Sequence, residues 1–161
     1  MPLAVQISPV VDNTGEESQA FAQIADDSAW PAHLFSQSLA APDSRCWAAR
    51  HPADGRLVGF CLLSVGPFDA EIELIAVAPE FRCQGIGGAL LDIAARAMAA
   101  AGKERLLLEV RASNHSAVSL YEKQGFHWDG RRRHYYPPAA EAHGGTSSER
   151  EDAWLFSRVL G

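Results

Sequence analysis

The sequence predicts a mixed α/β fold, and three observations support this fold class. Residues 46–77 contain short apolar segments separated by turn signals, which indicates an antiparallel meander of strands. Residues 85–125 then alternate helix, strand and helix, an order typical of helices layered on a sheet. Two further segments of strand composition close the chain. We therefore expect a central sheet with helices packed on it.

Length and composition fit one compact domain over residues 1–161. Apolar residues make up 47% and charged residues 21% of the 161 positions, within the usual globular range. A chain of this size buries roughly 70% of its unfolded surface. That is enough for one full hydrophobic core, so we expect a single domain.

Charge and cysteine content narrow the function classes. The net charge of −6 argues against direct nucleic-acid binding, which needs a basic face, whereas an acidic surface suits a basic protein partner. Cys46, Cys61 and Cys83 have neither disulfide-framework nor zinc-ligand spacing. Neither a basic leader nor an apolar run of membrane-spanning length is present. We expect a soluble, cytoplasmic protein without metal or membrane partner, as a monomer or weak dimer.

The N-terminal part predicts one strand and two helices. Residues 3–7 have strand composition, and residues 8–15 form a polar break. A helix follows, with apolar residues at helical spacing at Phe21, Ile24 and Ala25. It ends at Trp30-Pro31, because a residue before proline disfavours the helical region. Proline is well placed at a helix start, so a second helix is predicted over residues 31–39.

The meander predicts strands over residues 46–49, 57–65 and 71–77, separated by Asp54-Gly55 and Gly66-Pro67. In the last of these strands, three residues alternate with three apolar ones, namely Glu71, Glu73 and Ile75 with Ile72, Leu74 and Ala76. A period of two puts the two carboxylates on one face of the strand. The simplest explanation is a solvated sheet edge.

The strongest helix is predicted over residues 85–101, with Gly102 as its C-terminal stop. Its apolar stripe consists of Ile86, Leu90, Ile93, Ala94, Ala97 and Met98, and Asp92 and Arg96 pair on the other side.

The remaining elements are shorter. Residues 106–110 read as a buried strand, and residues 114–124 as a helix closed by Gly125. Residues 126–136 and 153–159 read as two closing strands. The stretch between them has loop composition, and residues 138–150 are expected to form a mobile loop.

A glycine-rich segment lies between a predicted strand and the strongest helix, and it reads Arg82, Cys83, Gln84, Gly85, Ile86, Gly87, Gly88. Glycines let the backbone approach a ligand closely, and the N–H groups at a helix start attract anions. A phosphate-bearing ligand fits this position. The alternative is a turn that only tightens the connection between strand and helix. Neither the Walker loop nor the dinucleotide fingerprint matches the segment.

An acid and a phenol form the second candidate site. Glu109 stands in a strand that reads as buried, where desolvation raises the pKa of a carboxyl group and suits it to accept a proton near neutral pH. Tyr121, in the following helix, has a hydroxyl group that can protonate a strongly basic leaving group. The alternative is a structural carboxylate and a packed tyrosine.

Two further features stay open at this point. His115 either faces a ligand or lies on the surface. The cluster at residues 131–136 (Arg-Arg-Arg-His-Tyr-Tyr) either binds acidic or aromatic groups of a substrate or is a solvated edge strand with protective charges.

Together these residues resemble the GNAT superfamily of acetyl-coenzyme A dependent N-acetyltransferases. Arg82-x-x-Gly85-x-Gly87 stands where that family has its pyrophosphate loop. The similarity is closest to the branch that acetylates the N-terminal alanine of a ribosomal protein, and it covers about residues 72–160. Five further motifs carry it: Leu-Glu-Val-Arg-Ala-Ser-Asn (108–114), Leu-Tyr-Glu (120–122), Gly-Phe (125–126), Arg-Arg-x-Tyr-Tyr-Pro (132–137) and Glu-Asp-Ala (151–153).

The resemblance implies a mostly antiparallel sheet of about six or seven strands with about four helices, and acetyl-CoA as co-substrate with no metal. It implies that the backbone of Ile75, Ala76 and Val77 pairs with the pantetheine arm. The pyrophosphate would lie on Arg82, Cys83, Gln84, Gly85, Ile86, Gly87 and Gly88. Asn114 matches a cofactor-contacting asparagine, Glu109 the general base and Tyr121 the general acid.

The implied reaction is direct transfer to the N-terminal α-amine of a basic small-subunit ribosomal protein that begins with alanine. The alternatives are another protein terminus, a lysine, a small amine, or a non-catalytic acyl-CoA binding module. Three departures from the family bear on the acceptor. Cys83 stands where a basic residue is common, His134 replaces an asparagine, and the loop 138–150 is longer than usual.

Overall fold

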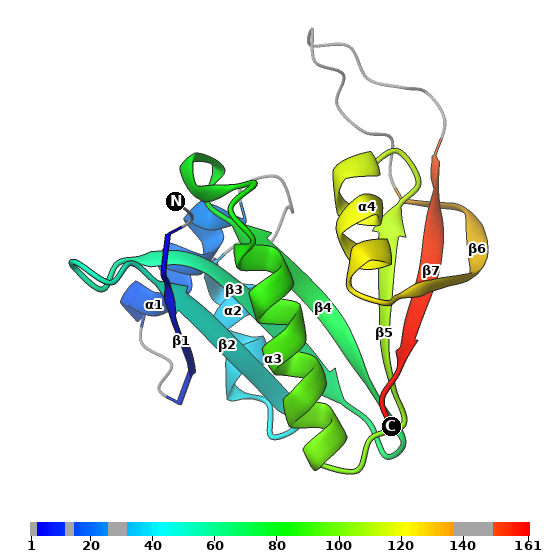
Figure 1. The fold of residues 1–161 in the computed structure, drawn as a ribbon, viewed down its shortest axis with the longest axis horizontal. Helices are drawn as coiled ribbons and strands as arrows, with labels where there is room; N and C mark the ends of the chain where they lie inside the picture. The colour runs from blue at the N-terminus through cyan, green and yellow to red at the C-terminus, as the bar shows by residue number, and fades with distance from the viewer. Residues whose placement is uncertain (1–2, 12–14, 26–31, 137–149) are drawn as a thin grey trace, which may run out of the picture.

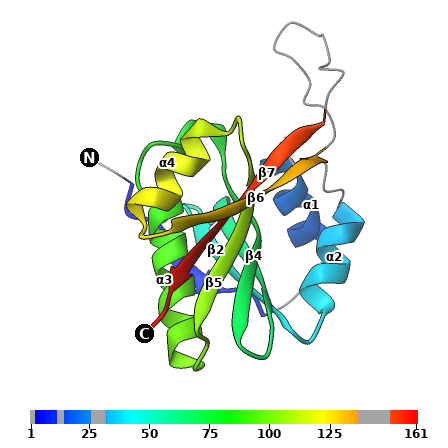
Figure 2. The ribbon, with the colours of Figure 1, turned by 90° about the vertical axis from the view of Figure 1, so that its right-hand side faces the viewer.

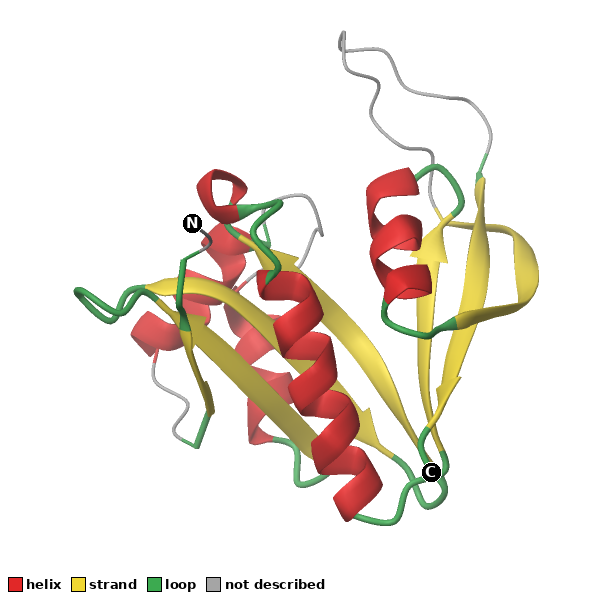
Figure 3. Cartoon of the chain, viewed as in Figure 1, coloured by secondary structure: helices red, strands yellow, loops and turns green. Residues whose placement is uncertain are grey.

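The computed structural model describes residues 3–11, 15–25, 32–136 and 150–161, and within them it confirms the mixed α/β fold class. The strands are β1 (Gln6–Pro9), β2 (Ser44–Arg50), β3 (Leu57–Val65), β4 (Asp69–Val77), β5 (Arg105–Arg111), β6 (His127–Tyr136) and β7 (Glu151–Val159). The α-helices are α1 (Gly15–Ile24), α2 (Ala32–Ala40), α3 (Ile86–Ala100) and α4 (His115–Lys123), and a 3₁₀ helix, η2, spans Pro79–Phe81. Figures 1 and 3 show their arrangement.

The strands form one sheet in the order β1-β2-β3-β4-β5-β7-β6. Neighbours are antiparallel except β4 and β5, which run parallel. The predicted meander is therefore confirmed as β2, β3 and β4. The first strand lies later than predicted, at Gln6–Pro9 instead of residues 3–7, because its pairing with β2 begins at Gln6 and continues to Pro9. Proline is tolerated there because β1 is an edge strand.

A β-bulge in β4 controls the geometry of the sheet. Leu63 of β3 pairs with Ile72, but the adjacent Leu62 pairs with Leu74, so Glu73 is an extra residue. The bulge reverses the faces that follow it. Ile75 packs in the same core cluster as Ile72, whereas Leu74 packs in the other cluster. The uninterrupted alternation predicted for residues 71–77 is therefore wrong.

The parallel pairing of β4 with β5 ends at the same place. It runs from Asp69 opposite Arg105 to Ile72 opposite Leu108 and goes no further. Figure 1 shows the two strands diverging beyond this point, with α3 beside one and α4 beside the other. The prediction of a solvated sheet edge is wrong for Glu71, which lies between Ser64 of β3 and Leu107 of β5, but it holds for Glu73, which lies beyond the last pair of β4 with β5. Both glutamates are nevertheless exposed.

Helices cover both faces of the sheet, with α3 and α4 on one face and α1 and α2 on the other (Figure 2). The predicted stripe of α3 is confirmed in part: Ile86, Leu90, Ala94 and Met98 are buried, while Ile93 and Ala97 are partly buried. Leu91 and Ala95 are also buried, so the apolar face is wider than predicted. The predicted ion pair is present, with 3.0 Å between Arg96 Nε and Asp92 Oδ2.

Three aromatic rings fasten α1 and α2 to the sheet. Phe21 of α1, Phe35 of α2 and Phe60 of β3 are fully buried. Their ring centroids lie 4.6 Å (Phe21 to Phe60), 5.6 Å (Phe35 to Phe60) and 5.9 Å (Phe21 to Phe35) apart. Aromatic pairs at such distances and tilted angles add to the stabilisation from burial.

Two predicted features fall on undescribed positions. The Trp30-Pro31 break lies outside the described residues, and so does the predicted loop except for Arg150. In the described part of the chain, no helix is both long and apolar enough to cross a membrane.

We predict that Phe35→Ala lowers the free energy of unfolding by about 3–5 kcal/mol, because it leaves a cavity under α2. Urea denaturation measures this loss. Val11→Ala is the control, because Val11 is 86% exposed, and its effect stays within about 0.5 kcal/mol. If Phe35→Ala does not fold, Phe35→Leu replaces it, with a loss of about 1.5 kcal/mol or less. Unchanged stability of the Phe35 variants would contradict the packing role.

Candidate active site

The glycine-rich loop leads from η2 into α3 and presents a row of backbone donors. Gly85, the residue before α3, has φ +83°, and Cys83 also has a positive φ of 61°. Among the described residues, no backbone acceptor pairs with the N–H groups of residues 83–88, whereas Ala89 N donates to Gly85 O. Such a row of N–H groups at a helix start is a ready anion site. Binding of a pyrophosphate here stays a prediction.

The two later glycines also serve the packing of α3 against α4. A Cβ atom on Gly87 would lie 3.0 Å from Leu120 Cδ2, and one on Gly88 would lie 2.7 Å from Gln124 Nε2. Nothing lies within 4 Å of the corresponding position on Gly85. Side chains of α4 and of its C-terminal cap therefore lie close to Gly87 and Gly88, while Gly85 is required by its backbone conformation.

The divergence of β4 and β5 leaves backbone edges open. Beyond Ile72, β4 pairs only with β3, and beyond Leu108, β5 pairs only with β7. Ile75, Ala76 and Val77 lie on this open edge of β4, just before η2 and the loop. An extended ligand can add to such an edge through main-chain hydrogen bonds. Pairing of this edge with a pantetheine arm stays a prediction.

Glu109 lies on β5 at the first position beyond this pairing. Its neighbours Leu108 and Val110 are buried in the core under α3 and α4, so the Glu109 side chain projects from the other face of the sheet. It is 19% exposed, and Arg132 Nη2 of β6 lies 3.2 Å from its Oε1. The pairing with Arg132 was not predicted from the sequence.

Two further side chains belong to the surroundings of Glu109. Burial raises the pKa of Glu71, the negative charge of Glu109 raises it further, and Arg132 lowers it. Burial, followed by the charge of Glu109, raises the pKa of Tyr136 to about 12. Glu71, Glu109, Arg132 and Tyr136 come from β4, β5 and β6, and they converge beside the open end of the sheet.

Hydrogen bonds and ion pairs of Arg111 and Glu151 lie next to this cluster, on the side of Tyr136. The Arg111 guanidinium lies 4.7 Å from the centroid of the Tyr136 ring and 3.2 Å from Glu151 Oε2. Glu151 Oε1 accepts a 2.7 Å hydrogen bond from Ser113 N. Burial raises the pKa of Glu151, but these bonds from Ser113 and Arg111 outweigh it, and the pKa is lowered overall. Glu151 therefore ties the end of β5 to β7 as an anion.

Tyr121 lies on α4, on the opposite face of the sheet from Glu109. It is 7% exposed and packs against Phe126 and Phe156, with ring centroids 5.9 and 6.5 Å away. Burial raises its pKa, so the phenol is held in its neutral form. The packed-tyrosine alternative is thus correct for the ring, and the role of the hydroxyl group stays a prediction.

The remaining candidates have structural explanations. Asn114 Oδ1 accepts a 3.3 Å hydrogen bond from Ala117 N and caps α4. His115 is exposed, in agreement with the surface alternative. His134 has φ +51°, a conformation for which asparagine and histidine are both enriched.

The ends of the 137–149 segment are fastened to each other. Asp152 Oδ1 accepts a hydrogen bond of 3.0 Å from His134 N. Arg150 donates to the carbonyl oxygens of His134 and Tyr135 over 2.9 and 2.6 Å. We refer to these contacts of Arg150 and Asp152 as the strand clamp. They hold β6 to β7 where the register between the two strands shifts.

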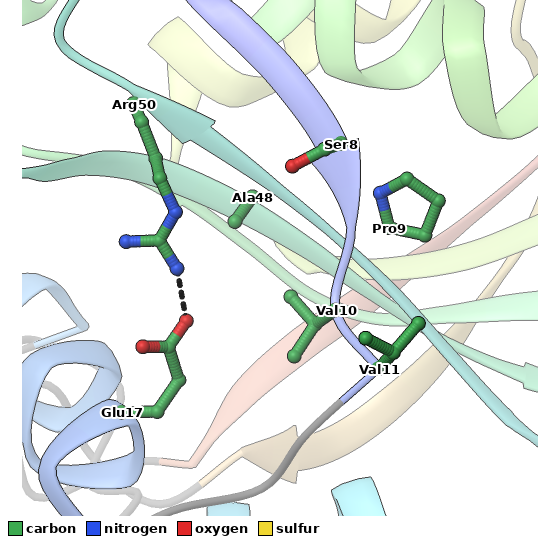
Figure 4. A pocket seen from close by; sticks show the side chains of 7 residues that line it. All are labelled: Ser8, Pro9, Val10, Val11, Glu17, Ala48 and Arg50. Atoms are coloured by element: carbon green, nitrogen blue, oxygen red, sulfur yellow. Dashed lines mark hydrogen bonds and ion pairs between the residues drawn. The ribbon is translucent and has the colours of Figure 1, made fainter. Parts of the chain in front are cut away.

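A surface pocket lies elsewhere, beside the start of α1 (Figure 4). Seven residues line it, among them Glu17 and Arg50, which form an ion pair. It contains no residue that the sequence singled out. The described residues contain no group of three or more His, Cys, Asp or Glu able to hold a metal ion.

Comparisons with known proteins agree with this geometry. The model of the Acetyltransferase (GNAT) family matches residues 13–126. N-alpha-acetyltransferase RimI of Mycobacterium tuberculosis is 36% identical over 128 residues, which cover 74% of this chain and 73% of that protein. The ribosomal protein bS18-alanine N-acetyltransferase of Escherichia coli K12 is 39% identical over 104 residues. The chain spans 65% of that enzyme and 33% of a longer relative, the uncharacterized protein ML0378 of Mycobacterium leprae.

Solved structures show the same fold. The crystal structure of the Escherichia coli ribosomal-protein-S18-alanine N-acetyltransferase superposes with a TM-score of 0.79 at 28% identity, covering 97% of this chain and 95% of that one. A GNAT family acetyltransferase from Elizabethkingia anophelis, solved with acetyl-CoA bound, gives a TM-score of 0.75 at 23% identity and covers 97% and 98% of the two chains. The resemblance noted in the sequence is confirmed, and the chain belongs to the GNAT family of acetyltransferases.

Proposed function

We propose that this chain is an acetyl-CoA dependent N-acetyltransferase that acts on the N-terminal α-amine of a protein, and that its acceptor is the alanine terminus of ribosomal protein bS18. The observation that carries the proposal is the position of Glu109, at the place where β5 separates from β4. The name of the Escherichia coli relative supports the alanine terminus of bS18 as acceptor, and the name of the Mycobacterium tuberculosis relative supports an α-amine.

The cofactor lies between the diverging strands in this proposal. The open edge at Ile75, Ala76 and Val77 pairs with the pantetheine arm, and the donors at residues 83–88 hold the pyrophosphate. Backbone donors do not depend on the side chain at position 83, so the loop binds phosphate although Cys83 replaces a basic residue. The solved relative with bound acetyl-CoA supports this cofactor.

Glu109 and Tyr121 divide the proton transfers. The neutral amine attacks the thioester carbonyl, and Glu109 accepts the amine proton, directly or through a water molecule. Tyr121, which lies on α4 on the other face of the sheet, donates a proton to the sulfur as the carbon–sulfur bond breaks. Because burial raises the pKa of Tyr121, the phenol holds its proton until the sulfur carries substantial negative charge. No covalent enzyme intermediate is needed.

The pKa of an α-amine, which is lower than that of a lysine side chain, favours the α-amine as acceptor. With a pKa near 7.7 to 8.0, roughly a fifth of an α-amine is neutral at pH 7.2, against under about 0.1% of a lysine near 10.4. The α-amine of a protein terminus is therefore more often neutral and ready to attack than a lysine amine, without help from the base. Glu71, Glu73 and Glu109 give this side of the sheet negative charge, which suits a basic acceptor.

We predict turnover of a peptide that begins Ala-Arg-Tyr-Phe, measured by release of coenzyme A from acetyl-CoA. The same peptide blocked at its N-terminus gives no turnover, because the α-amine is the nucleophile. A blocked peptide that carries lysine is the second control. Turnover of the lysine control alone, or of small amines alone, would replace the proposed acceptor. Binding of acetyl-CoA without turnover of any amine would instead indicate a non-catalytic module.

We predict that Glu109→Gln lowers kcat by about 100-fold or more, the usual size of a general-base contribution. The acetyl-CoA KM stays within about twofold, because no cofactor contact is removed. Glu104→Gln is the matched control, since Glu104 is exposed and lies before the paired start of β5. Steady-state kinetics compare the three proteins. A kcat equal to that of Glu104→Gln removes Glu109 from the mechanism.

We predict that Tyr121→Phe reduces kcat while calorimetry shows an unchanged Kd for acetyl-CoA. The ring and its contacts with Phe126 and Phe156 are kept, and only the hydroxyl group is lost. Thermal unfolding of the variant checks that α4 stays in place. A wild-type rate in this variant would mean that the departing thiolate takes its proton from elsewhere.

A further inference from the structure

The carboxylate proposed as the base is already paired with a cation. Arg132 Nη2 lies 3.2 Å from Glu109 Oε1, but the two side chains differ in burial: Arg132 is 55% exposed and Glu109 is 19% exposed. Most of the Glu109 side chain is covered by protein, whereas most of the Arg132 side chain faces solvent. The contact involves one nitrogen and one oxygen. An ion pair with so exposed a partner contributes little stability.

The surroundings of Arg132 hold it loosely. Its guanidinium carbon lies 5.3 Å from the centroid of the Tyr135 ring, and that ring is itself 43% exposed. β6 is an edge strand, and its pairing with β7 shifts register between Arg132 and Tyr136. Arg132 can therefore leave Glu109 by rotating its side chain, without breaking the sheet.

The cluster carries more negative than positive charge. The pKa of Glu71 is raised by burial and by Glu109 and lowered by Arg132, so both carboxylates interact with one guanidinium. Burial and then Glu71 raise the pKa of Glu73 on the same strand. The two carboxylates thus share the charge of Arg132. A second cation that reaches Glu109 competes with Arg132 for it.

We propose that Arg132 is a specificity-determining residue that occupies the position of the acceptor's ammonium group in the free enzyme and is displaced when a cationic acceptor binds. This inference rests on the proposed function, because it requires the acceptor amine to reach Glu109. An acceptor that brings its own positive charge replaces Arg132 without leaving the carboxylates unbalanced. A neutral nucleophile has no charge to exchange and leaves Glu109 paired. The site thus favours amines over nucleophiles that carry no positive charge.

Kinetics with the alanine-started peptide test the competition. Arg132→Gln removes the competing cation, so the acceptor KM falls by about 1.5- to 5-fold, the range expected for an exposed ion pair, while the acetyl-CoA KM is unchanged. Arg132→Lys keeps a cation and restores the wild-type KM. Arg131→Gln is the matched control: it removes the same charge from the next residue, whose side chain faces Asp152 at 3.8 Å. It leaves the acceptor KM unchanged.

A change in kcat alone, or a rise in the acceptor KM of Arg132→Gln, overturns the proposal, because Arg132 then orients the base or binds the acceptor. An equal fall in the acceptor KM for Arg131→Gln also overturns it, since the effect is then one of overall charge.

A binding measurement without turnover keeps the inference separate from the proposed function. L-alaninamide carries an α-ammonium group, and N-acetyl-alaninamide is its uncharged analogue. We expect L-alaninamide to move the NMR signal of the Arg132 Nε–H group toward that of a solvated arginine, and the uncharged analogue to leave it in place. An unmoved signal with saturating L-alaninamide overturns the inference, whether or not the peptide is acetylated. Failure of the wild type to acetylate the peptide, with a moved signal, overturns only the acceptor.

Discussion

The pairing of β4 with β5 is the constraint on which the rest of the structure depends. It stops after Ile72 and Leu108, where Glu73 bulges out of β4. If the pairing continued to Val77, it would occupy the backbone groups that an extended ligand needs. The end of the pairing therefore leaves free the edge of β4 on which the cofactor is proposed to pair, and Glu109, the proposed base, is the first residue of β5 beyond it.

The sequence predicts the order and type of the described elements but not the faces of β4. Hydrophobic periodicity and turn residues locate most strands and helices, because burial and turn chemistry act locally. The bulge leaves no local signal: Glu73 continues the alternation that Glu71 begins, and only the pairing with β3 shows that it is extra. The register between strands is set by contacts distant in sequence, and a shift of one residue reverses every face.

In the candidate site too, residues with a local sequence pattern are predictable and contacts set by strand register are not. Glu109 and the glycine-rich loop are recognisable because each has a local pattern in the sequence. The cluster at residues 131–136 is recognisable too, but the contact of Arg132 with Glu109 is not, because β7 lies between β5 and β6 and the contact depends on how three strands are registered. The glycines of residues 85–88 are explained by two different constraints, backbone conformation and side-chain contacts. Gly85 is required by its backbone conformation, while Gly87 and Gly88 lie against the side chains of Leu120 and Gln124, so a glycine pattern by itself does not separate binding from packing.

The strand clamp makes the pairing of β6 with β7 independent of the length of the chain between residues 136 and 150. Arg150 and Asp152 bond to the backbone of His134 and Tyr135, so β6 and β7 are joined before the intervening segment begins. The entropy of closing a longer connection grows only slowly with its length. Substitution, shortening or extension between the clamped ends therefore costs the fold little. This is the place where a relative of this chain can acquire a new recognition segment, or an engineer can graft one, beside an unchanged catalytic framework.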